Sequence, residues 1–183
     1  MLKFNFHPFP QLETERFILR QPQESDLDEF YFFRTDPSIK TYIDKEPEKN
    51  KGEVLQWLRG IQQSWENNEA ILWGIQMKEE EKLIGNLGFW NIQAEHHRAE
   101  LGYVLDPKQH KQGIMHECLQ AIIAYGFERM KLHSIEANIN PANEASRRLL
   151  LKNNFVKEGY FKENWYFRGK FGDSEIYSLL NSK

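Results

Sequence analysis

The chain has 183 residues, 40% of them hydrophobic and 28% charged, which indicates one folded domain over residues 1–183 and excludes a disordered chain. Its formal net charge of −3 supplies no excess of cations for phosphates, so we expect no direct nucleic-acid binding. The single cysteine, Cys118, excludes an intrachain disulfide and favours a reducing, cytoplasmic location. We expect neither a secretory leader nor a membrane span.

Hydrophobic spacing divides the chain into about seven strands and four helices. The expected strands are residues 12–20, 70–77, 82–92, 99–105, 133–139, 155–167 and 174–180. The expected helices begin near Ser25, Val54, Gly113 and Asn143, the first with a capping box of Ser25 and Asp28. This order of elements predicts an α+β fold, with helices packed on a mostly antiparallel sheet.

The stretch from Ala99 to Met115 joins a strand, a basic polar loop and a glycine that begins a long helix. The first amides of a helix lack internal partners and its dipole is positive there, so this point would suit an anion such as a pyrophosphate. Gly113 would let the ligand approach the backbone, and Lys111 adds charge. A plain strand–loop–helix connection is the alternative. The stretch is neither a Walker loop nor a dinucleotide-binding fingerprint, because it lacks their further glycines and the Lys-Ser/Thr pair.

Several stretches, in the right order, resemble the GNAT superfamily of N-acetyltransferases, in particular its RimJ/RimL-like branch of ribosomal-protein N-acetyltransferases. They are residues 12–20, 83–88, 99–115, 140–150 and 155–159, which together run along nearly the whole chain. The resemblance implies the GNAT fold, a mostly antiparallel twisted sheet with a central splay. It also implies transfer of an acetyl group from acetyl-coenzyme A to a primary amine, with no metal.

The resemblance implies roles for individual residues. Acetyl-coenzyme A would lie between the strands ending at Leu105 and Ile139, with its pantetheine arm along the main chain. The N–H of Val104 would stabilise the charge on the thioester oxygen, Glu100 would act as base directly or through a water, and Ser146 or solvent would protonate the thiolate. The expected cofactor-binding residues are Val104, Leu105, His110, Lys111, Gln112, Gly113, Ile114, Met115, Asn138, Asn143 and Ser146.

Three positions depart from the family pattern. His110 stands where Gln or Arg is usual, and Met115 where a small residue is usual; we expect binding to survive both, because backbone amides do the binding. Leu150 stands where many members carry a tyrosine as general acid, which leaves that role open.

Each role has a plainer alternative. Glu100 could be a surface carboxylate, Ser146 an ordinary helix residue and Asn143 only an N-cap. The histidines His96, His97 and His116 lack a third ligand at a useful spacing, so solvated side chains are expected there.

The acceptor is the least determined part. A protein N-terminus, a polyamine and an aminoglycoside all remain open, as does a GNAT-like binding module without catalysis. The acceptor would be selected by residues 38–52, residues 91–98 and the turn around Gly169. The protein is expected to be a monomer or a homodimer.

Overall fold

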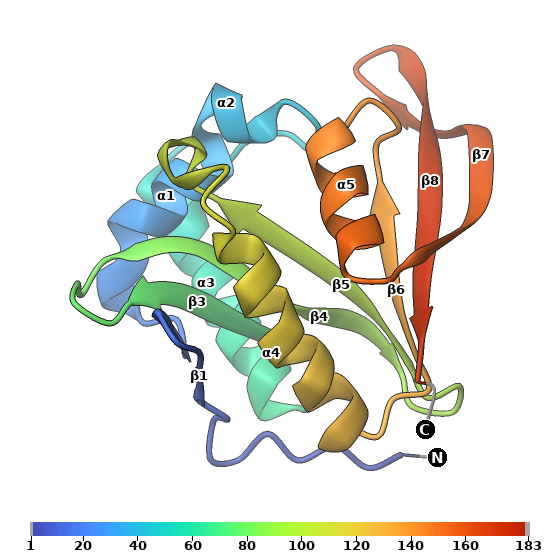
Figure 1. The fold of residues 1–183 in the computed structure, drawn as a ribbon. Coiled ribbons are helices and arrows are strands. Elements are labelled where there is room, and N and C mark those ends of the chain that lie inside the picture. Colours follow the sequence, from blue (N-terminus) through green and yellow to red (C-terminus); the bar gives the residue numbers. More distant parts are fainter. Residues whose placement is uncertain (1, 182–183) are drawn as a thin grey trace.

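The computed structural model describes residues 2–181 and places them in an eight-stranded sheet with helices on both faces (Figure 1). The strands are β1 Leu12–Glu13, β2 Phe17–Arg20, β3 Ile71–Met77, β4 Leu83–Gln93, β5 Arg98–Leu105, β6 Ser134–Ile139, β7 Val156–Phe167 and β8 Lys170–Leu180. The helices are α1 Leu27–Thr35, α2 Pro37–Lys40, α3 Lys51–Glu66, α4 Ile114–Glu128 and α5 Glu144–Lys152. The predicted α+β class is confirmed, with one more strand and one more helix than expected.

The expected first strand is two strands that form a tight hairpin with each other. Thr14 closes the turn, since its N–H donates to the carbonyl of Phe17 at 2.9 Å and its hydroxyl accepts from the N–H of Phe17 at 3.0 Å. The prediction of one strand over residues 12–20 is wrong because the alternation holds only within β2, where Phe17 and Leu19 are buried as expected.

The predicted capping box of Ser25 and Asp28 is also wrong. A 3-10 turn precedes α1, and Gln23 and Asp26 form the box instead. The carboxylate of Asp26 accepts the N–H of Gln23 at 2.7 Å and both terminal nitrogens of Arg20, at 2.7 and 2.8 Å. These bonds hold residues Glu24–Asp26 in the 3-10 turn, so α1 begins only at Leu27.

The β7–β8 hairpin is longer than expected. Its turn is only Arg168 and Gly169, both with positive φ (48° and 82°), which is typical of a two-residue hairpin turn. β8 therefore begins at Lys170 rather than Ser174.

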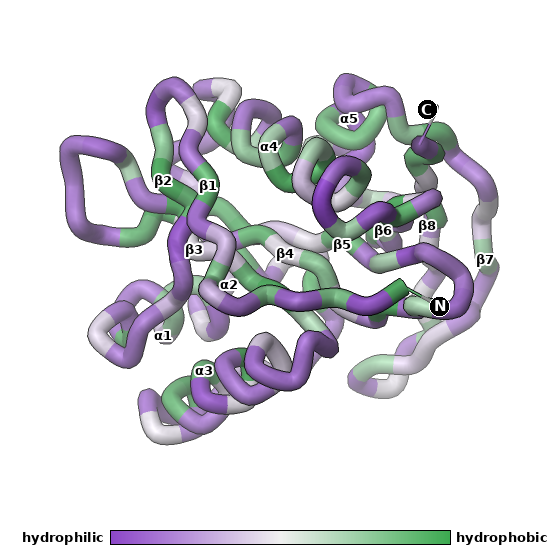
Figure 2. Tube along the Cα trace, turned by 90° about the horizontal axis from the view of Figure 1, so that it is seen from below, coloured by the Kyte–Doolittle hydropathy of each residue, from purple (hydrophilic) through white to green (hydrophobic). Residues whose placement is uncertain are grey.

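Two hydrophobic clusters lie on opposite faces of the sheet. The larger packs β2–β6 against α4 and α5, and the smaller packs α1 and α3 against the other face. α3 is hydrophilic over most of its length, as expected for an outer helix (Figure 2). Along β5, Leu101 and Tyr103 face the larger cluster and Val104 faces the smaller. No helix within residues 2–181 is long and apolar enough to cross a lipid bilayer.

The central splay follows from how far β5 and β6 pair. They run parallel and pair only over Arg98–Ser134, Ala99–Ile135 and Glu100–Glu136. Beyond this point β5 continues along β4 to Leu105, and β6 continues along β8 to Ile139. The two strands therefore diverge toward the beginnings of α4 and α5 (Figure 1).

Candidate active site

A cleft of about 780 Å³ opens where β5 separates from β6. It is lined by the end of β5, the loop that follows it, the first turn of α4, one side of α5 and part of the segment after α1. Most of the predicted site lines it, namely Val104, Leu105, His110, Lys111, Gly113, Ile114, Met115, Asn143 and Ser146. Gln112, Asn138 and Glu100 do not.

The beginning of α4 lies at the cleft with its amides uncapped. Gly113 is the N-cap residue, its φ is 76°, and no side chain caps this helix. Arg16 holds this end in place: its Nε donates to Glu117 at 2.8 Å and its Nη1 to the carbonyl of Gln112 at 3.2 Å. Gln112 therefore supports the loop from outside the cleft, and the free helix end suits an anionic group.

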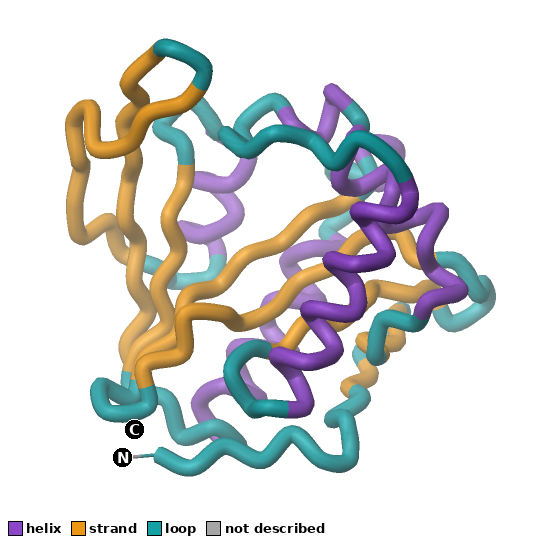
Figure 3. Tube along the Cα trace, turned by 180° about the vertical axis from the view of Figure 1, so that it is seen from behind, coloured by secondary structure: helices purple, strands orange, loops and turns teal. Residues whose placement is uncertain are grey.

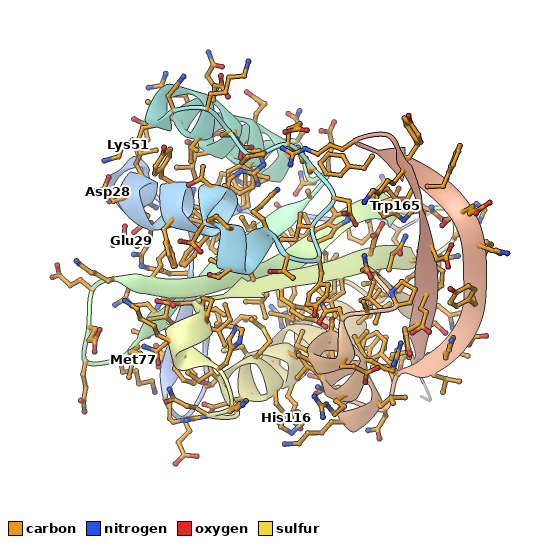
Figure 4. All side chains as sticks on the ribbon, turned by 90° about the horizontal axis from the view of Figure 1, so that it is seen from above. Asp28, Glu29, Lys51, Met77, His116 and Trp165 are labelled. Atoms are coloured by element: carbon orange, nitrogen blue, oxygen red, sulfur yellow. The ribbon has the colours of Figure 1, made fainter. Side chains whose placement is uncertain are left out.

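Cationic side chains gather at the same cleft. Lys111 comes from the loop, and Arg148 and Lys152 come from α5 at a spacing of four, which places them on one helix face. His116 of α4, labelled in Figure 4, also lines the cleft and its Nδ1 lies 3.0 Å from Oδ1 of Asn153. Sequence reasoning missed Arg148 and Lys152, although their spacing was a usable signal. An elongated ligand with several phosphates, such as acetyl-coenzyme A, fits this charge.

β5 offers main-chain groups to the cleft. The N–H of Asp106 donates to the carbonyl of Ile84 at 2.9 Å, one step beyond the Gly85–Leu105 pair. Hydrogen bonds alternate along an antiparallel pair, so the main-chain groups of Leu105 and Tyr103 point to the open edge while those of Val104 point to β4. Nε2 of His110 lies 3.2 Å from the carbonyl oxygen of Leu105, in agreement with this pattern. Stabilisation of the thioester oxygen by the N–H of Val104 stays a prediction. The hydrogen-bond pattern between β4 and β5 favours the N–H groups of Tyr103 and Leu105 for this role.

A hydrogen bond joins the two walls of the cleft. The hydroxyl of Tyr103 on β5 lies 2.5 Å from the hydroxyl of Ser146 on α5. Asn143 is the N-cap of α5, as the plainer interpretation held, and its side chain accepts from the N–H of Ser146 at 3.0 Å. Burial raises the pKa of Tyr103 to about 12, against a smaller opposing effect of the bond to Ser146. Sequence reasoning missed Tyr103, because nothing in the pattern of residues 99–105 distinguishes it from an ordinary strand residue. Leu150 is fully buried in the core.

Glu100 lies at the vertex of the splay, in the last register pair with Glu136. It shares the α3 side of β5 with Gly102 and Val104, opposite to Tyr103. The indole of Trp90 covers Gly102 on this side, since a Cβ at Gly102 would lie 1.6 Å from that ring. Glu100 is partly exposed beside this indole, so its predicted role as base, which no contact tests, would act from the face opposite to α4 and α5.

The segment between α2 and α3, residues 41–50, crosses from the helices to the far side of the splay (Figure 3). Tyr42 and Ile43 line the cleft. Asp44 accepts from Asn140 at 3.4 Å, and Glu46 forms an ion pair with Arg168 of the β7–β8 turn. Two of the three loops expected to select the acceptor therefore touch each other.

Metal ligands and the thiol of Cys118 are the other groups that could carry chemistry. Within residues 2–181, no three His, Cys, Asp or Glu side chains lie close enough to hold a metal ion. Burial raises the pKa of Cys118 to about 12, so this thiol stays protonated near neutral pH and is a poor nucleophile.

Comparison with known proteins agrees with this geometry. Residues 16–156 match the family described as an acetyltransferase (GNAT) domain. The chain is 31% identical over 175 residues, 96% of its length and 99% of the other, to YoaA, an uncharacterized N-acetyltransferase of Bacillus subtilis. It is 28% identical over 180 residues, 94% of its length and 91% of the other, to the ribosomal protein uS5-alanine N-acetyltransferase of Escherichia coli.

Solved structures of acetyltransferases share the fold of this chain. The ribosomal-protein-S5-alanine acetyltransferase of Vibrio fischeri superimposes with a TM-score of 0.84 at 28% identity, over 95% of this chain and 98% of that one. RimL, an acetyltransferase of ribosomal protein L7/L12, shares the fold with a TM-score of 0.85 at 21% identity, over 98% of this chain and 99% of that one. The cleft, the splayed sheet and these matches together show that the chain belongs to the GNAT family and is an acyl-CoA N-acetyltransferase.

Proposed function

We propose that this enzyme acetylates the N-terminal α-amine of a protein, with a ribosomal protein as the first class to test. The observation that carries the acetyl-coenzyme A part is the meeting of an uncapped helix end and an open strand edge in one cleft. The acceptor class is supported by a relative, matched over 94% of this chain and 91% of its own length, that is named as an alanine N-acetyltransferase of ribosomal protein uS5.

The cleft suggests how acetyl-coenzyme A is held. The pyrophosphate would meet the amides from Gly113 to His116, and Arg148 and Lys152 would pair with the remaining phosphate. The pantetheine arm would add as a strand to the open edge at Tyr103 and Leu105, where the ring of His110 now contacts a carbonyl. Bound in this way, acetyl-coenzyme A supplies an activated acyl group at the vertex of the splay.

The acceptor amine would approach from the α3 side of the sheet. Glu100 at the vertex would accept its proton, directly or through a water, while a main-chain N–H of the open edge would stabilise the charge that develops on the carbonyl oxygen. The loops that touch each other above the splay, residues 41–50 and the β7–β8 turn, would shape the entrance.

The acceptor is tested by thiol release from acetyl-coenzyme A with matched amines. Peptides that begin with alanine or serine and copy ribosomal-protein N-termini are compared with the same peptides blocked at the N-terminus but carrying an internal lysine. Spermidine and an aminoglycoside are the small-molecule comparators. We expect turnover only with the free N-termini.

Exclusive turnover of spermidine or the aminoglycoside would overturn the proposed acceptor. Turnover of the blocked peptides would assign the enzyme to lysine side chains instead. Binding of coenzyme A in calorimetry without transfer to any amine would favour a binding module that has lost catalysis.

A further inference from the structure

The leaving thiolate needs a proton, and the residue from which many family members supply it is absent. Leu150 stands at that position of α5, carries no exchangeable proton and is fully buried in the core. Ser146 lies four residues earlier and therefore on the same face of the helix. The phenol of Tyr103 reaches this face from the opposite wall, because β5 turns that side chain toward α5.

We propose that the hydroxyl of Tyr103 donates the proton to the leaving thiolate, and that Ser146 is a positioning residue that holds this hydroxyl. The proposal rests on the acetyl transfer proposed above and assigns a residue to one step of it. Both residues line the cleft, and their hydroxyl oxygens lie 2.5 Å apart.

The surroundings suit this division of roles. Ser146 is only 6% exposed, and the N-cap bond that its N–H donates to the side chain of Asn143 fixes the first turn of α5. The main chain of Tyr103 lies on the open strand edge, so the residue that would contact the pantetheine arm also carries the phenol. A phenol is a stronger acid than an aliphatic alcohol, and burial keeps this one protonated at neutral pH.

The charged groups that line the cleft do not oppose this proton transfer. The described residues that line it include Lys111, Arg148, Lys152 and two histidines, His110 and His116, and they include no carboxylate. No negative side chain of the lining therefore repels the charge that moves from sulfur to the phenol.

The step balances as follows. The amine nitrogen bonds to the acetyl carbon, its proton leaves to Glu100 or water, and the carbon–sulfur bond breaks with its electron pair on sulfur. The hydroxyl proton of Tyr103 moves to sulfur and gives the free thiol of coenzyme A. Ser146 donates a hydrogen bond to the phenolate, which regains a proton from solvent at the cleft mouth.

The first test is kinetic. Tyr103→Phe keeps the ring and its packing and removes only the donor, so we expect kcat to fall by about 10²-fold while coenzyme A affinity in calorimetry stays within about threefold. Ser146→Ala should lower kcat by a smaller factor, and the double variant should be no worse than Tyr103→Phe. Tyr125→Phe is the matched control, because Tyr125 is a half-buried tyrosine of α4 that packs on Trp73 outside the cleft.

The second test needs no turnover. A fluorotyrosine at position 103 gives a fluorine NMR signal whose shift reports the ionisation of the phenol. Ser146→Ala should raise the pKa at which this signal titrates, because the variant removes a hydrogen bond that lowers it. Coenzyme A should shift the signal at position 103 and leave a fluorotyrosine at position 125 unchanged.

The two levels of the proposal fail in different ways. A wild-type enzyme that acetylates peptides and a Tyr103→Phe variant with the same kcat would overturn the role of Tyr103 alone. A coenzyme A complex that leaves the fluorine signal at position 103 unmoved would also overturn it. A wild-type protein without turnover but with a coenzyme A shift at position 103 would instead overturn the proposed function.

Discussion

The two halves of the sheet are covered by helices to different degrees. Strands β1–β5 are packed on both faces, by α4 on one side and by α1 and α3 on the other. Strands β6, β8 and β7 carry α5 on one face, and the β7–β8 ribbon leaves large side chains such as Tyr166 and Phe171 more than 60% exposed. Figure 4 shows this ribbon, with Trp165 labelled, at the opposite edge of the molecule from α1.

A buried carboxylate ties the second half together. Glu175 of β8 is 3% exposed and accepts hydrogen bonds from Lys157 of β7 at 2.6 Å, Tyr177 of β8 at 2.9 Å and Arg147 of α5 at 3.1 Å. Burial acts to raise the pKa of Glu175, but these bonds and the charge of Arg147 outweigh it and lower the pKa. The second half thus adds a buried cluster of charged side chains to the apolar packing of β6 and α5, and the cleft lies between the two halves.

The largest expected effect concerns the wall built by the first half. Gly113→Asp and Gly113→Asn add side chains of the same size at a φ of 76°, a conformation that both residues tolerate. Only Asp adds negative charge where the pyrophosphate would lie. We expect Gly113→Asp to weaken coenzyme A binding in calorimetry by about 10³-fold, and Gly113→Asn by roughly tenfold. Equal affinities for the two variants, with equal melting temperatures, would place the phosphates elsewhere.

The second prediction concerns the buried carboxylate of Glu175 in the other half. Glu175→Gln removes the countercharge of Arg147 and Lys157, so we expect the free energy of unfolding at pH 7 to fall by about 3 kcal/mol. Because the folded-state pKa of Glu175 is lowered, its contribution is present above the unfolded value of about 4.3 and is lost as the pH falls through the folded value. The difference between wild type and variant should therefore shrink below about pH 4.

Urea unfolding at several pH values measures this difference. Glu158→Gln is the control, since Glu158 is an exposed carboxylate of the same ribbon that accepts a hydrogen bond from Ser178 at 2.7 Å. Its effect should stay within about 0.5 kcal/mol. If the difference in free energy of unfolding between wild type and Glu175→Gln is the same at pH 3 as at pH 7, then the charge of Glu175 does not stabilise this half.

The smallest predicted effect concerns the vertex, where the halves still pair. Glu100→Gln should lower kcat by about 10²-fold and leave coenzyme A affinity unchanged, because a base acts only in the chemical step. The loss should shrink at high pH, where more of the amine is already neutral. Glu136→Gln is the matched control, since Glu136 is the register partner of Glu100 and is ion-paired with Arg98. Wild-type kcat in Glu100→Gln across pH would make Glu100 a structural carboxylate.

The sequence predicted best where function depends on the backbone. The strand–loop–helix pattern from Ala99 to Met115 predicted where the uncapped helix begins, because Gly113 and the change in hydrophobic spacing are local signals. The Tyr103–Ser146 bond was not predictable, since it joins residues 43 positions apart that look like core and helix surface. The split of residues 12–20 was missed because a two-residue strand is too short for alternation to show.

The contact that steadies the beginning of α4 has a consequence for how the enzyme is made. Arg16 and Glu117 lie 101 positions apart in the chain. A ribosome builds proteins from the N-terminus, so the first hairpin waits for more than half of the chain before its arginine can meet α4. Until then the helix end lacks this support. The start of α4, where we propose that the donor phosphates bind, is therefore completed only late in synthesis.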